Sequence, residues 1–374
     1  MSLRRLACVV AVAITAAFYL APGALAETVV ALSNGGNQLE RFDSATPGTV
    51  FGTVSITGLQ AGETLLTIDF RPANGQLDAL SNQNRLYTVN PTTGAATQVG
   101  SSGAFTLSGT FFGMDVNPVV DRIRVVSDAD QNLRLNPNDG TLTATDATLA
   151  YAAGDPNFGA NPNEVALAYS NNVAGALSTT LYGIDSGLDV LAMQGGPGGI
   201  PSANGGVLTT VGALGVDTSG LAGFDISPGG TAYAMLHSLP LLPADFYTIN
   251  LATGAATLVG AIGGVAVVSD ITVALGPTAV RMRSLEAVRS PRGVVIRWRT
   301  AAESRTLGFN VYREERGRRV RLNGALIPSA LSGADRTYSY LDRRPLRTRS
   351  RYWIEAVGID GSRSSYGPAS VRPR

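Results

Sequence analysis

The segment YTVNPTTGAATQVG (residues 87–100) returns almost unchanged as YTINLATGAATLVG (residues 247–260). In each copy a short apolar stretch ends in Asn, and a Gly follows four positions later. This pattern is typical of a β-strand that enters a tight turn, because Asn can bond its own backbone there and Gly takes a positive φ without strain. The two copies therefore predict a chain built from repeated β-units.

Weaker copies of the same pattern extend the repeat over most of the chain. Apolar strands that end in Asp or Asn are expected at residues 39–43, 86–90, 132–136, 181–185 and 246–250, and their last residues are spaced by 47, 46, 49 and 65 positions. Gly48, Gly94, Gly140 and Gly254 are the expected positive-φ turn residues. A period in the forties that carries several short strands is typical of a β-propeller blade.

A second repeated element precedes each unit and predicts the innermost strand of each blade. It occurs at residues 66–72, 113–118 and 223–228, with weaker versions at 165–169 and 270–275. The chain begins its first unit in the middle, at residues 28–32, and ends with an inner strand that has no unit of its own, at residues 271–275. We expect these two segments to pair and close the ring, which leaves no long open edge. We predict an all-β fold with a propeller of five blades, and six is the alternative.

These repeats also resemble a family of exported bacterial domains of unknown function, DUF4394. The resemblance rests on NQLERFDSATPG (37–48), LTIDFRP (66–72), NPVVDRIRVVSD (117–128), QNLRLN (131–136) and LYGIDSGLD (181–189), and it covers nearly all of residues 27–275. It implies secretion and a repetitive β-fold. It implies no activity, so no residue inherits a catalytic role from it.

Charge divides the chain into two parts. All 29 basic residues are Arg; residues 27–279 hold 6 of them against 20 acids, whereas residues 280–374 hold 21 against 8 acids. Such a reversal marks a domain boundary. We predict a signal peptide at 1–26, a propeller-like domain at 27–276, a linker at 277–282 and a second domain at 283–374.

The N-terminal segment has the features of a cleaved export signal. Arg4 and Arg5 precede an apolar run at residues 6–21, and Ala-Leu-Ala at 24–26 supplies the small residues before a cleavage site. The run is shorter than the ~20 residues that a membrane-spanning helix needs. We expect a secreted or cell-surface protein with no transmembrane segment after cleavage.

The basic second domain has the alternation of a β-sandwich. In GVVIRWRT (293–300), Val294, Ile296 and Trp298 share one face, and residues 309–313 and 352–357 alternate in the same way. About seven strands in ~95 residues predict an immunoglobulin-like sandwich with Trp298 in its core. The segment resembles a fibronectin type III domain, which implies that the phenol of Tyr352 bonds a backbone group across the sandwich. In secreted bacterial proteins such a module usually spaces or attaches its neighbour.

The residue inventory excludes several mechanisms. The absence of Lys rules out a Walker-type phosphate loop and a Schiff-base lysine. Cys8 lies in the predicted signal peptide and His237 is the single His, so neither a thiolate site nor a histidine metal cluster can form. An exported protein without a recognition helix is not expected to bind nucleic acid.

Two groups in the propeller are candidate ligand-binding residues. Asp69, Asp115 and Asp225 end predicted inner strands near one mouth of the channel, where their carboxylates could bind a cation or act as acid and base; capping of the next turn is the simpler interpretation. Arg122 and Arg124, with Arg134 close by, could bind an anionic ligand. Their simpler interpretation is pairing with neighbouring acids of the sequence, namely Asp121, Asp128 or Asp130.

Two further groups are weaker candidates. Asp128, Asp130, Asn132 and Asp139 have the spacing of a calcium-binding loop, but the segment lacks both the glycine and the bidentate Glu of that motif. We therefore expect no cofactor and keep calcium as the alternative. The second domain carries arginines that could bind an anionic envelope polymer or dock on the acidic domain: Arg318, Arg319, Arg321, Arg343, Arg344 and Arg347.

The sequence as a whole favours an exported, non-enzymatic binding or cell-surface protein. In this hypothesis the propeller binds a glycan or a surface protein, and the arginine-rich sandwich acts as a spacer or retains the protein on an anionic surface. The alternative is a carbohydrate-active hydrolase or lyase that uses carboxylates at the channel mouth, which requires two acids ~5–10 Å apart facing one cavity.

Overall fold

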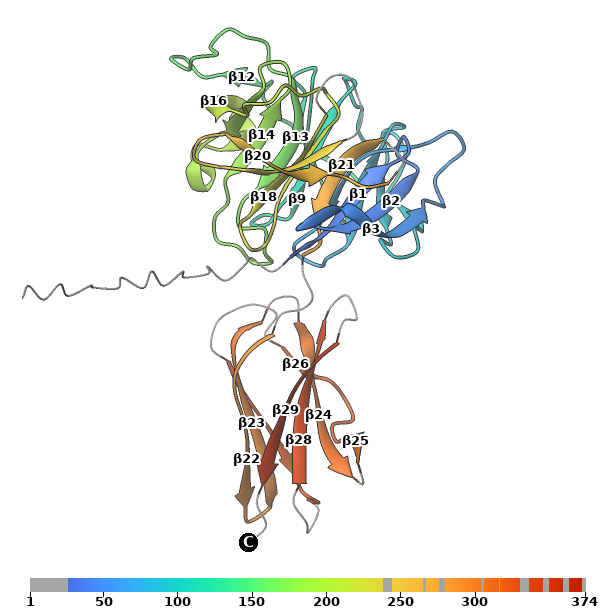
Figure 1. Cartoon of the computed structure of the whole chain (residues 1–374), viewed down its shortest axis with the longest axis vertical. Coiled ribbons are helices and arrows are strands. Elements are labelled where there is room, and N and C mark those ends of the chain that lie inside the picture. The colour runs from blue at the N-terminus through green and yellow to red at the C-terminus, as the bar shows by residue number, and fades with distance from the viewer. Residues whose placement is uncertain are drawn as a thin grey trace, which may run out of the picture.

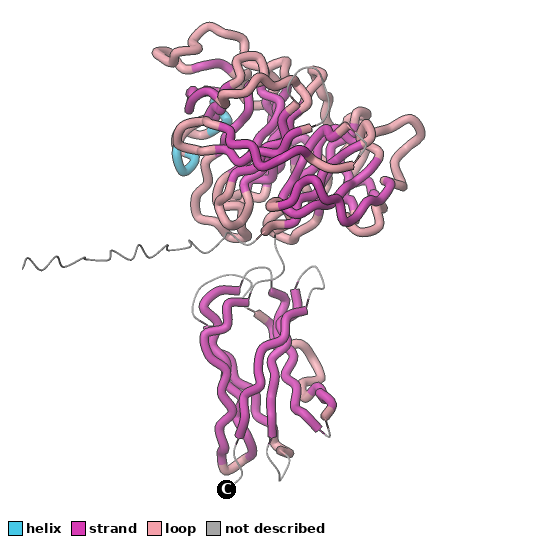
Figure 2. The backbone as a smooth tube through the Cα atoms, in the orientation of Figure 1, coloured by secondary structure: helices cyan, strands magenta, loops and turns pink. Residues whose placement is uncertain are grey.

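The computed structural model describes residues 26–237, 244–264, 267–275, 280–303, 306–315, 317–329, 336–345, 350–358 and 363–371. These residues are almost entirely strands and turns, and the short 3₁₀ helices η1 (Pro197–Gly199) and η2 (Ala203–Gly205) are the helical segments among them (Figure 2). Nearly all of the predicted signal peptide lies outside the described part of the chain. Within that part, no helix has the length and apolar character needed to cross a membrane.

The acidic part of the chain forms five antiparallel sheets, which we number as blades 1 to 5. Blade 1 has the strand order β21 (Val268–Val273), β1 (Thr28–Ser33), β2 (Gln38–Asp43) and β3 (Thr46–Ser55). Blade 2 contains β4 (Leu65–Phe70), β5 (Leu77–Ser81), β6 (Leu86–Val89) and β7 (Ala96–Val99). Blade 3 contains β8 (Phe112–Asn117), β9 (Arg122–Ser127), β10 (Asn132–Leu135) and β11 (Leu142–Thr145).

Blades 4 and 5 complete the set. Blade 4 contains β13 (Glu164–Tyr169), β14 (Leu181–Asp185), β15 (Val190–Gln194) and β16 (Val207–Ala213), with β12 (Ala150–Tyr151) added in parallel at its outer edge. Blade 5 contains β17 (Ala222–Ile226), β18 (Ala232–Leu236), β19 (Asp245–Ile249) and β20 (Ala256–Ala261).

The inner strands form a closed ring. Each of β4, β8, β13, β17 and β21 contacts the next, and β21 contacts β4. The ring is sealed within blade 1, where the late strand β21 pairs with the early strand β1 so that Val29 lies opposite Val273 and Ala31 opposite Ile271 (Figure 1). The predicted five-bladed propeller and its closure by the two chain segments are confirmed.

Apolar side chains between the blades hold the ring together. At the closure, Phe42 of blade 1 meets Phe246 of blade 5 edge to face with 5.2 Å between ring centroids, and Tyr233 stacks on the other side of Phe246 at 5.2 Å. All three rings are buried. Aromatic pairs of this kind add roughly 0.5–1.5 kcal/mol beyond the burial of their area, so the seam is stabilised by packing as well as by the β1–β21 ladder.

The predicted strand at 181–185 is present and ends in Asp, but it takes a different place in its blade from the other four. Residues 181–185 form β14, the second strand of its blade, whereas the other four segments form third strands. The reason is local: Asp185 Oδ1 accepts the backbone N–H groups of Gly187 and Leu188, so the turn between β14 and β15 has the same strand-and-Asp signature. The prediction for Gly48 was wrong, because it lies inside β3 without a positive φ, while the other three predicted turn glycines have φ values between 69° and 81°.

The basic part of the chain forms a sandwich of two sheets. One sheet contains β22 (Val280–Ser290), β23 (Gly293–Glu303) and β27 (Arg336–Asp342). The other contains β24 (Thr306–Glu315), β25 (Arg318–Arg321), β26 (Ile327–Pro328), β28 (Ser350–Gly358) and β29 (Arg363–Val371). The strand β22 begins inside the predicted linker 277–282.

Side chains from both sheets of the sandwich share one core. Trp298 is fully buried between Phe309 and Tyr338, with ring centroids 5.5 Å away in each case, as its alternation with Val294 and Ile296 predicted. The Tyr352 phenol donates to the Asp342 carboxylate at 2.9 Å instead of a backbone group. The fold is therefore an immunoglobulin-like sandwich, and its assignment to the fibronectin type III class stays a prediction.

Candidate functional site

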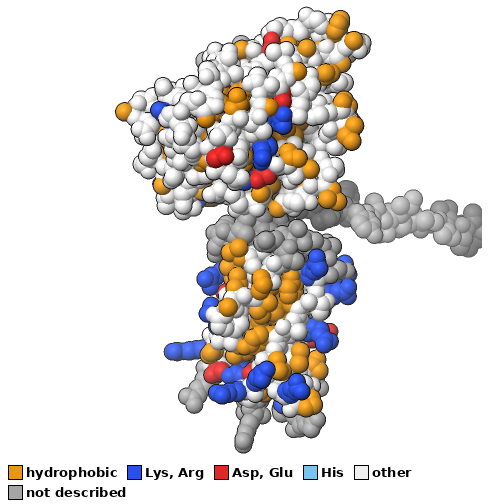
Figure 3. Space-filling view, turned by 180° about the vertical axis from the view of Figure 1, so that it is seen from behind, with side chains coloured by type: hydrophobic (Ala, Val, Ile, Leu, Met, Phe, Trp, Pro, Cys, Tyr) orange, Lys and Arg blue, Asp and Glu red, His pale blue; other side chains and the backbone are white. Residues whose placement is uncertain are grey.

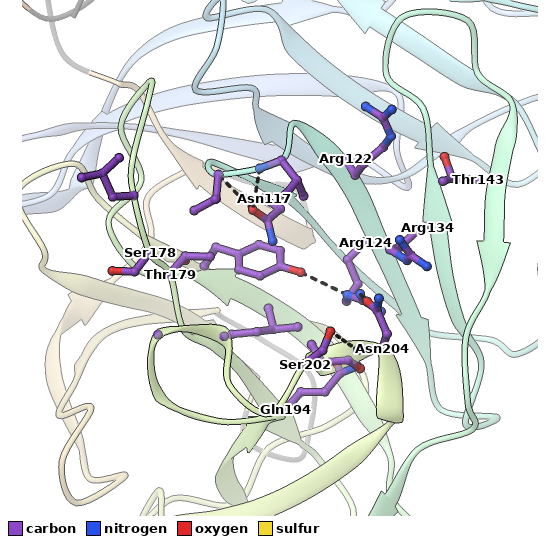
Figure 4. Close-up of a pocket in the computed structure, with 18 residues that line it drawn as sticks. Asn117, Arg122, Arg124, Arg134, Thr143, Ser178, Thr179, Gln194, Ser202 and Asn204 are labelled. Carbon is purple, nitrogen blue, oxygen red and sulfur yellow. Dashed lines mark hydrogen bonds between the residues drawn. The ribbon is translucent and has the colours of Figure 1, made fainter.

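A pocket of about 470 Å³ opens between blades 3 and 4 (Figure 4). Its volume is in the range of small-molecule sites. Amide, hydroxyl and guanidinium groups line it together with a few apolar side chains, and its lining contains three arginines and no acid. Its lining includes Arg122, Arg124, Arg134, Tyr169, Leu177, Gln194 and Asn204. We call this site the arginine pocket.

Two of these arginines share one carboxylate. Arg124 on β9 lies directly opposite Arg134 on β10. Arg134 binds Asp146 with both Nε (2.7 Å) and Nη2 (2.9 Å), and Arg124 Nη1 binds the same carboxylate at 3.1 Å. Among the described residues, the predicted partners Asp121, Asp128 and Asp130 form no salt bridge with these arginines. Their partner is Asp146, which follows β11.

Arg124 is a structural link between the two blades. Its side chain is 3% exposed, and it donates to Tyr169 Oη at 3.1 Å, to Asn204 Oδ1 at 2.6 Å and to Asn132. Tyr169 belongs to β13 and Asn204 to η2, so one guanidinium joins blade 3 to blade 4. Removing it would leave several buried acceptors without a donor, which is costly.

Arg122 differs from the other two. It donates to the main-chain oxygen of its neighbour Asp121 at 2.8 Å, and the Asp121 carboxylate is taken by Arg71 of blade 2. Among the described residues, no carboxylate lies within salt-bridge distance of Arg122. Three guanidinium groups against the single Asp146 give the arginine pocket an excess of positive charge within an acidic propeller.

A buried amide oxygen also faces the pocket region without a partner. Gln194, the last residue of β15, is 1% exposed, and its Nε2 donates to the Ala203 carbonyl at 2.8 Å. Its Oε1 accepts no hydrogen bond from any described residue. Buried polar atoms are nearly always paired, so such an atom in a pocket lining marks a place for a donor from water or ligand. At the rim, Leu177 is 97% exposed and offers an apolar surface beside these polar groups.

The glycine-rich residues 195–199 border the same pocket through Gly198 and Gly199. Their backbone N–H groups are already used: Gly195 donates to Val207, Gly196 to Pro201 and Gly199 to Gly196. A phosphate cradle needs such donors to be free, so this segment contributes shape to the pocket and not an anion nest.

The predicted aspartates converge, but not at an open mouth. Asp69, Asp115 and Asp225 lie on the inner strands β4, β8 and β17, are 1–2% exposed, and offer one oxygen each within 4.8 Å of the others. We call this group the hub cluster. Neither the arginine pocket nor a second pocket of about 730 Å³ beside Phe70 and Leu275 is lined by any of them.

Their hydrogen bonds run between blades and do not cap the next turn, which corrects the simpler interpretation. Each carboxylate accepts a backbone N–H from the inner strand of a neighbouring blade: Asp69 from Val116 (2.9 Å), Asp115 from Tyr169 (3.0 Å) and Asp225 from Val273 (2.6 Å). Burial is the main cause that raises the pKa of all three carboxyls, and that of Asp225 rises to about 6. Repulsion from the other acids of the cluster raises the pKa of Asp69 and Asp115 further.

The calcium-loop candidates are occupied by different partners. Asp128 accepts the N–H groups of Thr110 and Phe111, Asn132 accepts from Arg124, and Asp139 accepts from Thr141. Within the described part of the chain, the three-acid group with metal-compatible spacing is the hub cluster and does not include Asp130.

The arginines of the sandwich form a largely exposed set. Arg318, Arg319 and Arg321 lie on the exposed strand β25, and Arg343 and Arg344 are exposed after β27. Arg319 stacks over the Trp353 ring at 4.5 Å, so its charge is held in place. Figure 3 shows basic side chains scattered over this domain. Arg347 lies outside the described residues.

The family described as Domain of unknown function (DUF4394) matches residues 38–272, which run from β2 to the end of the closing strand β21. The chain belongs to the DUF4394 family. The match covers most of the propeller, so the arginine pocket and the hub cluster both lie within the DUF4394 domain. No curated protein matches the chain.

Several solved structures are similar to the chain at low identity. One is the extracellular domain of a protein named as a hybrid two-component system of B. thetaiotaomicron, with 9% identity, a TM-score of 0.33, and coverage of 92% of this chain and 47% of that one. The second is a protein from Lactobacillus plantarum, with 13% identity, a TM-score of 0.32, and coverage of 93% of this chain and 97% of that one. The third is the Dos1 propeller, with 10% identity, a TM-score of 0.33, and coverage of 91% of this chain and 84% of that one. The chain thus spans about half the length of the first.

The sequence predicted the arginines of the pocket and the acids of the hub, but not the arginine partners Asp146 and Asn204 or the pocket residue Gln194. These three residues lie outside the predicted repeat segments, and no local motif distinguishes them. Tyr169 carried a usable signal, because it ends a predicted inner strand and faces the neighbouring blade.

Proposed function

We propose that this DUF4394 protein is an exported, non-enzymatic binding protein whose arginine pocket holds an acidic, hydroxyl-rich ligand such as a segment of an acidic glycan. The observation that carries the proposal is the guanidinium of Arg122, which has no carboxylate partner among the described residues and lies in a pocket without acidic lining. An arginine fork binds carboxylate or sulfate groups with two charge-assisted hydrogen bonds.

The rest of the pocket lining suits the neutral part of such a ligand. Gln194 Oε1 can accept a hydroxyl hydrogen, and the hydroxyls of Ser178, Thr179 and Ser202 can both donate and accept. Exposed Leu177 offers an apolar surface for a sugar ring face. The second pocket, beside Phe70, has no charged lining residue and is a weaker candidate for a charged ligand.

The sandwich is proposed to space the propeller or to retain it on an anionic surface. Support comes from the exposed arginines of β25 and of the segment after β27, and from the reversal of charge relative to the propeller. Attraction between an arginine face and an anionic polymer is screened by salt. We therefore expect retention to weaken steeply as ionic strength rises.

The carbohydrate-active alternative has less support. It requires carboxylates that face a substrate cavity, and the hub cluster is buried and lines neither pocket. The pocket itself is lined by arginines and amides, which bind anions but do not act as a general acid and base near neutral pH.

The binding experiment compares an oligouronate with its carboxyl-reduced, neutral counterpart by calorimetry on the full chain. We expect the oligouronate to bind and the neutral oligosaccharide to bind far more weakly. Arg122→Gln should lower the affinity about 10- to 100-fold, the loss of one hydrogen bond to a charged group. The matched control is Arg85→Gln, which removes a salt-bridged arginine of blade 2 outside the pocket.

Two results would count against the proposal. Equal binding of both oligosaccharides, or an unchanged affinity in Arg122→Gln, would remove the arginine pocket as the site. New reducing ends or unsaturated products in the same mixtures would instead favour the hydrolase or lyase alternative.

The role of the sandwich is tested by deleting residues 280–374 and measuring how much protein stays with the producing cells. We expect the deletion to release the propeller into the medium and the full chain to be released by high salt. Retention of the truncated chain at the level of the full chain would refute the assigned role.

A further inference from the structure

We propose that the hub cluster is a divalent cation site, in which Asp69, Asp115 and Asp225, with the amide of Asn172, bind one Ca²⁺ ion at the centre of the propeller. This site is independent of the arginine pocket and of the ligand proposed for it. Its role is to fasten the inner strands of separate blades to one another.

Five equivalent positions of the inner strands surround the centre, one from each blade: Asp69, Asp115, Ala168, Asp225 and Thr272. Each of the four polar side chains accepts a backbone N–H from the next inner strand of the ring. The donor is in each case the residue directly after the equivalent position. The donors are Val116, Tyr169, Val273 and Phe70. Ala168 has no side-chain oxygen, so the ring of oxygens is interrupted between Asp115 and Asp225.

The hub cluster has fewer hydrogen-bond donors than carboxylate oxygens that need one. The Thr272 hydroxyl lies 3.1 Å from Asp69 Oδ1 and 2.9 Å from Asp225 Oδ2, and it carries a single hydrogen. It can therefore donate to one carboxylate and must present a lone pair to the other. The repulsion between these lone pairs is removed by a bound cation or by a proton on the second carboxyl.

Two further buried oxygens of the hub region have no hydrogen-bond partner among the described residues. Asp115 Oδ1 accepts no hydrogen bond, although Asp115 is 1% exposed. Asn172, which is fully buried, reaches into the cluster from the loop after β13 and places its Nδ2 3.3 Å from Asp225 Oδ1, while its own Oδ1 has no partner. Both orphan atoms are acceptors, and a cation that reaches both would satisfy them together.

The ligand chemistry selects a hard cation. Carboxylate and amide oxygens are ligands of Ca²⁺ and Mg²⁺, and neither His nor Cys belongs to the cluster, so softer metals are disfavoured. The ligand oxygens lie within 4.8 Å of one another, which is about twice a Ca²⁺–oxygen bond of ~2.4 Å. Ca²⁺ also tolerates the irregular coordination that a ring with one missing ligand imposes.

Because the cluster is buried, exchange with solvent is expected to need opening of the ring. The experiment therefore unfolds the full chain in guanidinium and refolds it in excess EDTA, in CaCl₂ or in MgCl₂. Bound metal is measured by elemental analysis after gel filtration in metal-free buffer, and Tm by circular dichroism. We expect about one Ca²⁺ per chain and, at ~100 times Kd, a Tm about 5–10 °C above that in EDTA.

Variants locate the ion. Asp115→Asn should fold and lose both the bound Ca²⁺ and the calcium-dependent gain in Tm, whereas Glu164→Gln, a buried acid of β13 outside the hub cluster, should keep both. Should Asp115→Asn fail to fold, Asn172→Ala is expected to lower the calcium affinity at least tenfold. The refolding comparison on the unsubstituted chain needs no variant.

Three results would overturn the proposal. One is a refolded protein that binds well under ~0.1 Ca²⁺ per chain and has the same Tm in EDTA and in CaCl₂. The second is stoichiometric Ca²⁺ that persists in Asp115→Asn with an undiminished gain in Tm. The third is a larger gain in Tm with MgCl₂ than with CaCl₂, which would refute the choice of ion.

Discussion

Substitution of Glu164 by Gln should make the propeller more stable at neutral and alkaline pH. Glu164 begins β13, is fully buried and lies opposite Asp185 in the ladder with β14. Within the part of the chain that the structure describes, neither of its carboxylate oxygens has a hydrogen-bond partner. Burial, and to a smaller extent the charge of Asp185, raises its pKa from 4.5 to about 8.

The sign of the effect follows from proton binding. Between pH 4.5 and 8 the folded state keeps the proton on Glu164 while the unfolded state has lost it, so the free energy of unfolding falls as pH rises. Each pKa unit corresponds to about 1.4 kcal/mol. The loss relative to acid pH is then roughly 3 kcal/mol at pH 7 and roughly 5 kcal/mol above pH 8. Gln is the uncharged isostere, so Glu164→Gln removes this dependence.

The assay is urea unfolding of both proteins at pH 5, 6, 7 and 8. Trp298 and Trp353 are the only tryptophans and both belong to the sandwich, so the transition seen by circular dichroism but not by tryptophan fluorescence is that of the propeller. The difference in free energy between variant and unsubstituted chain should grow by about 1.4 kcal/mol per pH unit. Asp217→Asn, the same kind of acid-to-amide change at an exposed position, is the matched control. Parallel pH curves for Glu164→Gln and the unsubstituted chain would refute the reasoning.

Three other predictions concern packing, closure and backbone conformation. Trp298→Ala should lower the stability of the sandwich by about 3–5 kcal/mol and leave the propeller transition in place, because Trp298 is fully buried in the sandwich core; calorimetry that shows both transitions shifted would contradict it. A chain that ends at Ile262 lacks the inner strand of blade 1 and should lose cooperative unfolding and aggregate, whereas one that ends at Leu275 should not; equal behaviour in light scattering would argue against closure by β21. Gly100→Ala should lower the free energy of unfolding more than Gly103→Ala. Both glycines have a positive φ (69° and 75°), which costs alanine about 1–2 kcal/mol, but the new Cβ at 100 would lie 1.7 Å from the Asp139 carbonyl oxygen and that at 103 would meet nothing within 4 Å. Equal urea midpoints of the two variants would contradict this.

The propeller could be predicted because its local signals agree with its global arrangement. The inner strands share an Asp or its equivalent followed by a turn, and the segments at 28–32 and 271–275 are incomplete until they pair. The different place of residues 181–185 in blade 4 has the same origin. An Asp at a strand end signals a turn, and Asp185 makes that turn one strand earlier than the matching residues of the other blades.

The candidate sites could be predicted in part. Equivalent residues of a closed ring must approach its centre, so convergence of Asp69, Asp115 and Asp225 follows once the ring is known. Their depth does not follow, because it depends on how tightly five inner strands close. The pocket required contacts between blades: Asp146 and Asn204 meet Arg124 only after separate segments fold against it, and spacing along the chain carries no trace of that.

One residue connects the two sites. Tyr169 donates its backbone N–H to Asp115 in the hub cluster, and its phenol oxygen accepts from Arg124 in the arginine pocket. Asp115 and Arg124 are themselves direct partners in the β8–β9 ladder of blade 3. A cation bound by Asp115 of β8 and by Asn172 in the loop after β13 would hold β13 against β8, and Tyr169 would carry that constraint to its contact with Arg124 in the pocket. If occupancy of the hub changes the affinity for an acidic ligand, the ligand must change the affinity for the cation by the same factor, so the two proposals can be joined by a single measurement of calcium affinity with and without oligouronate.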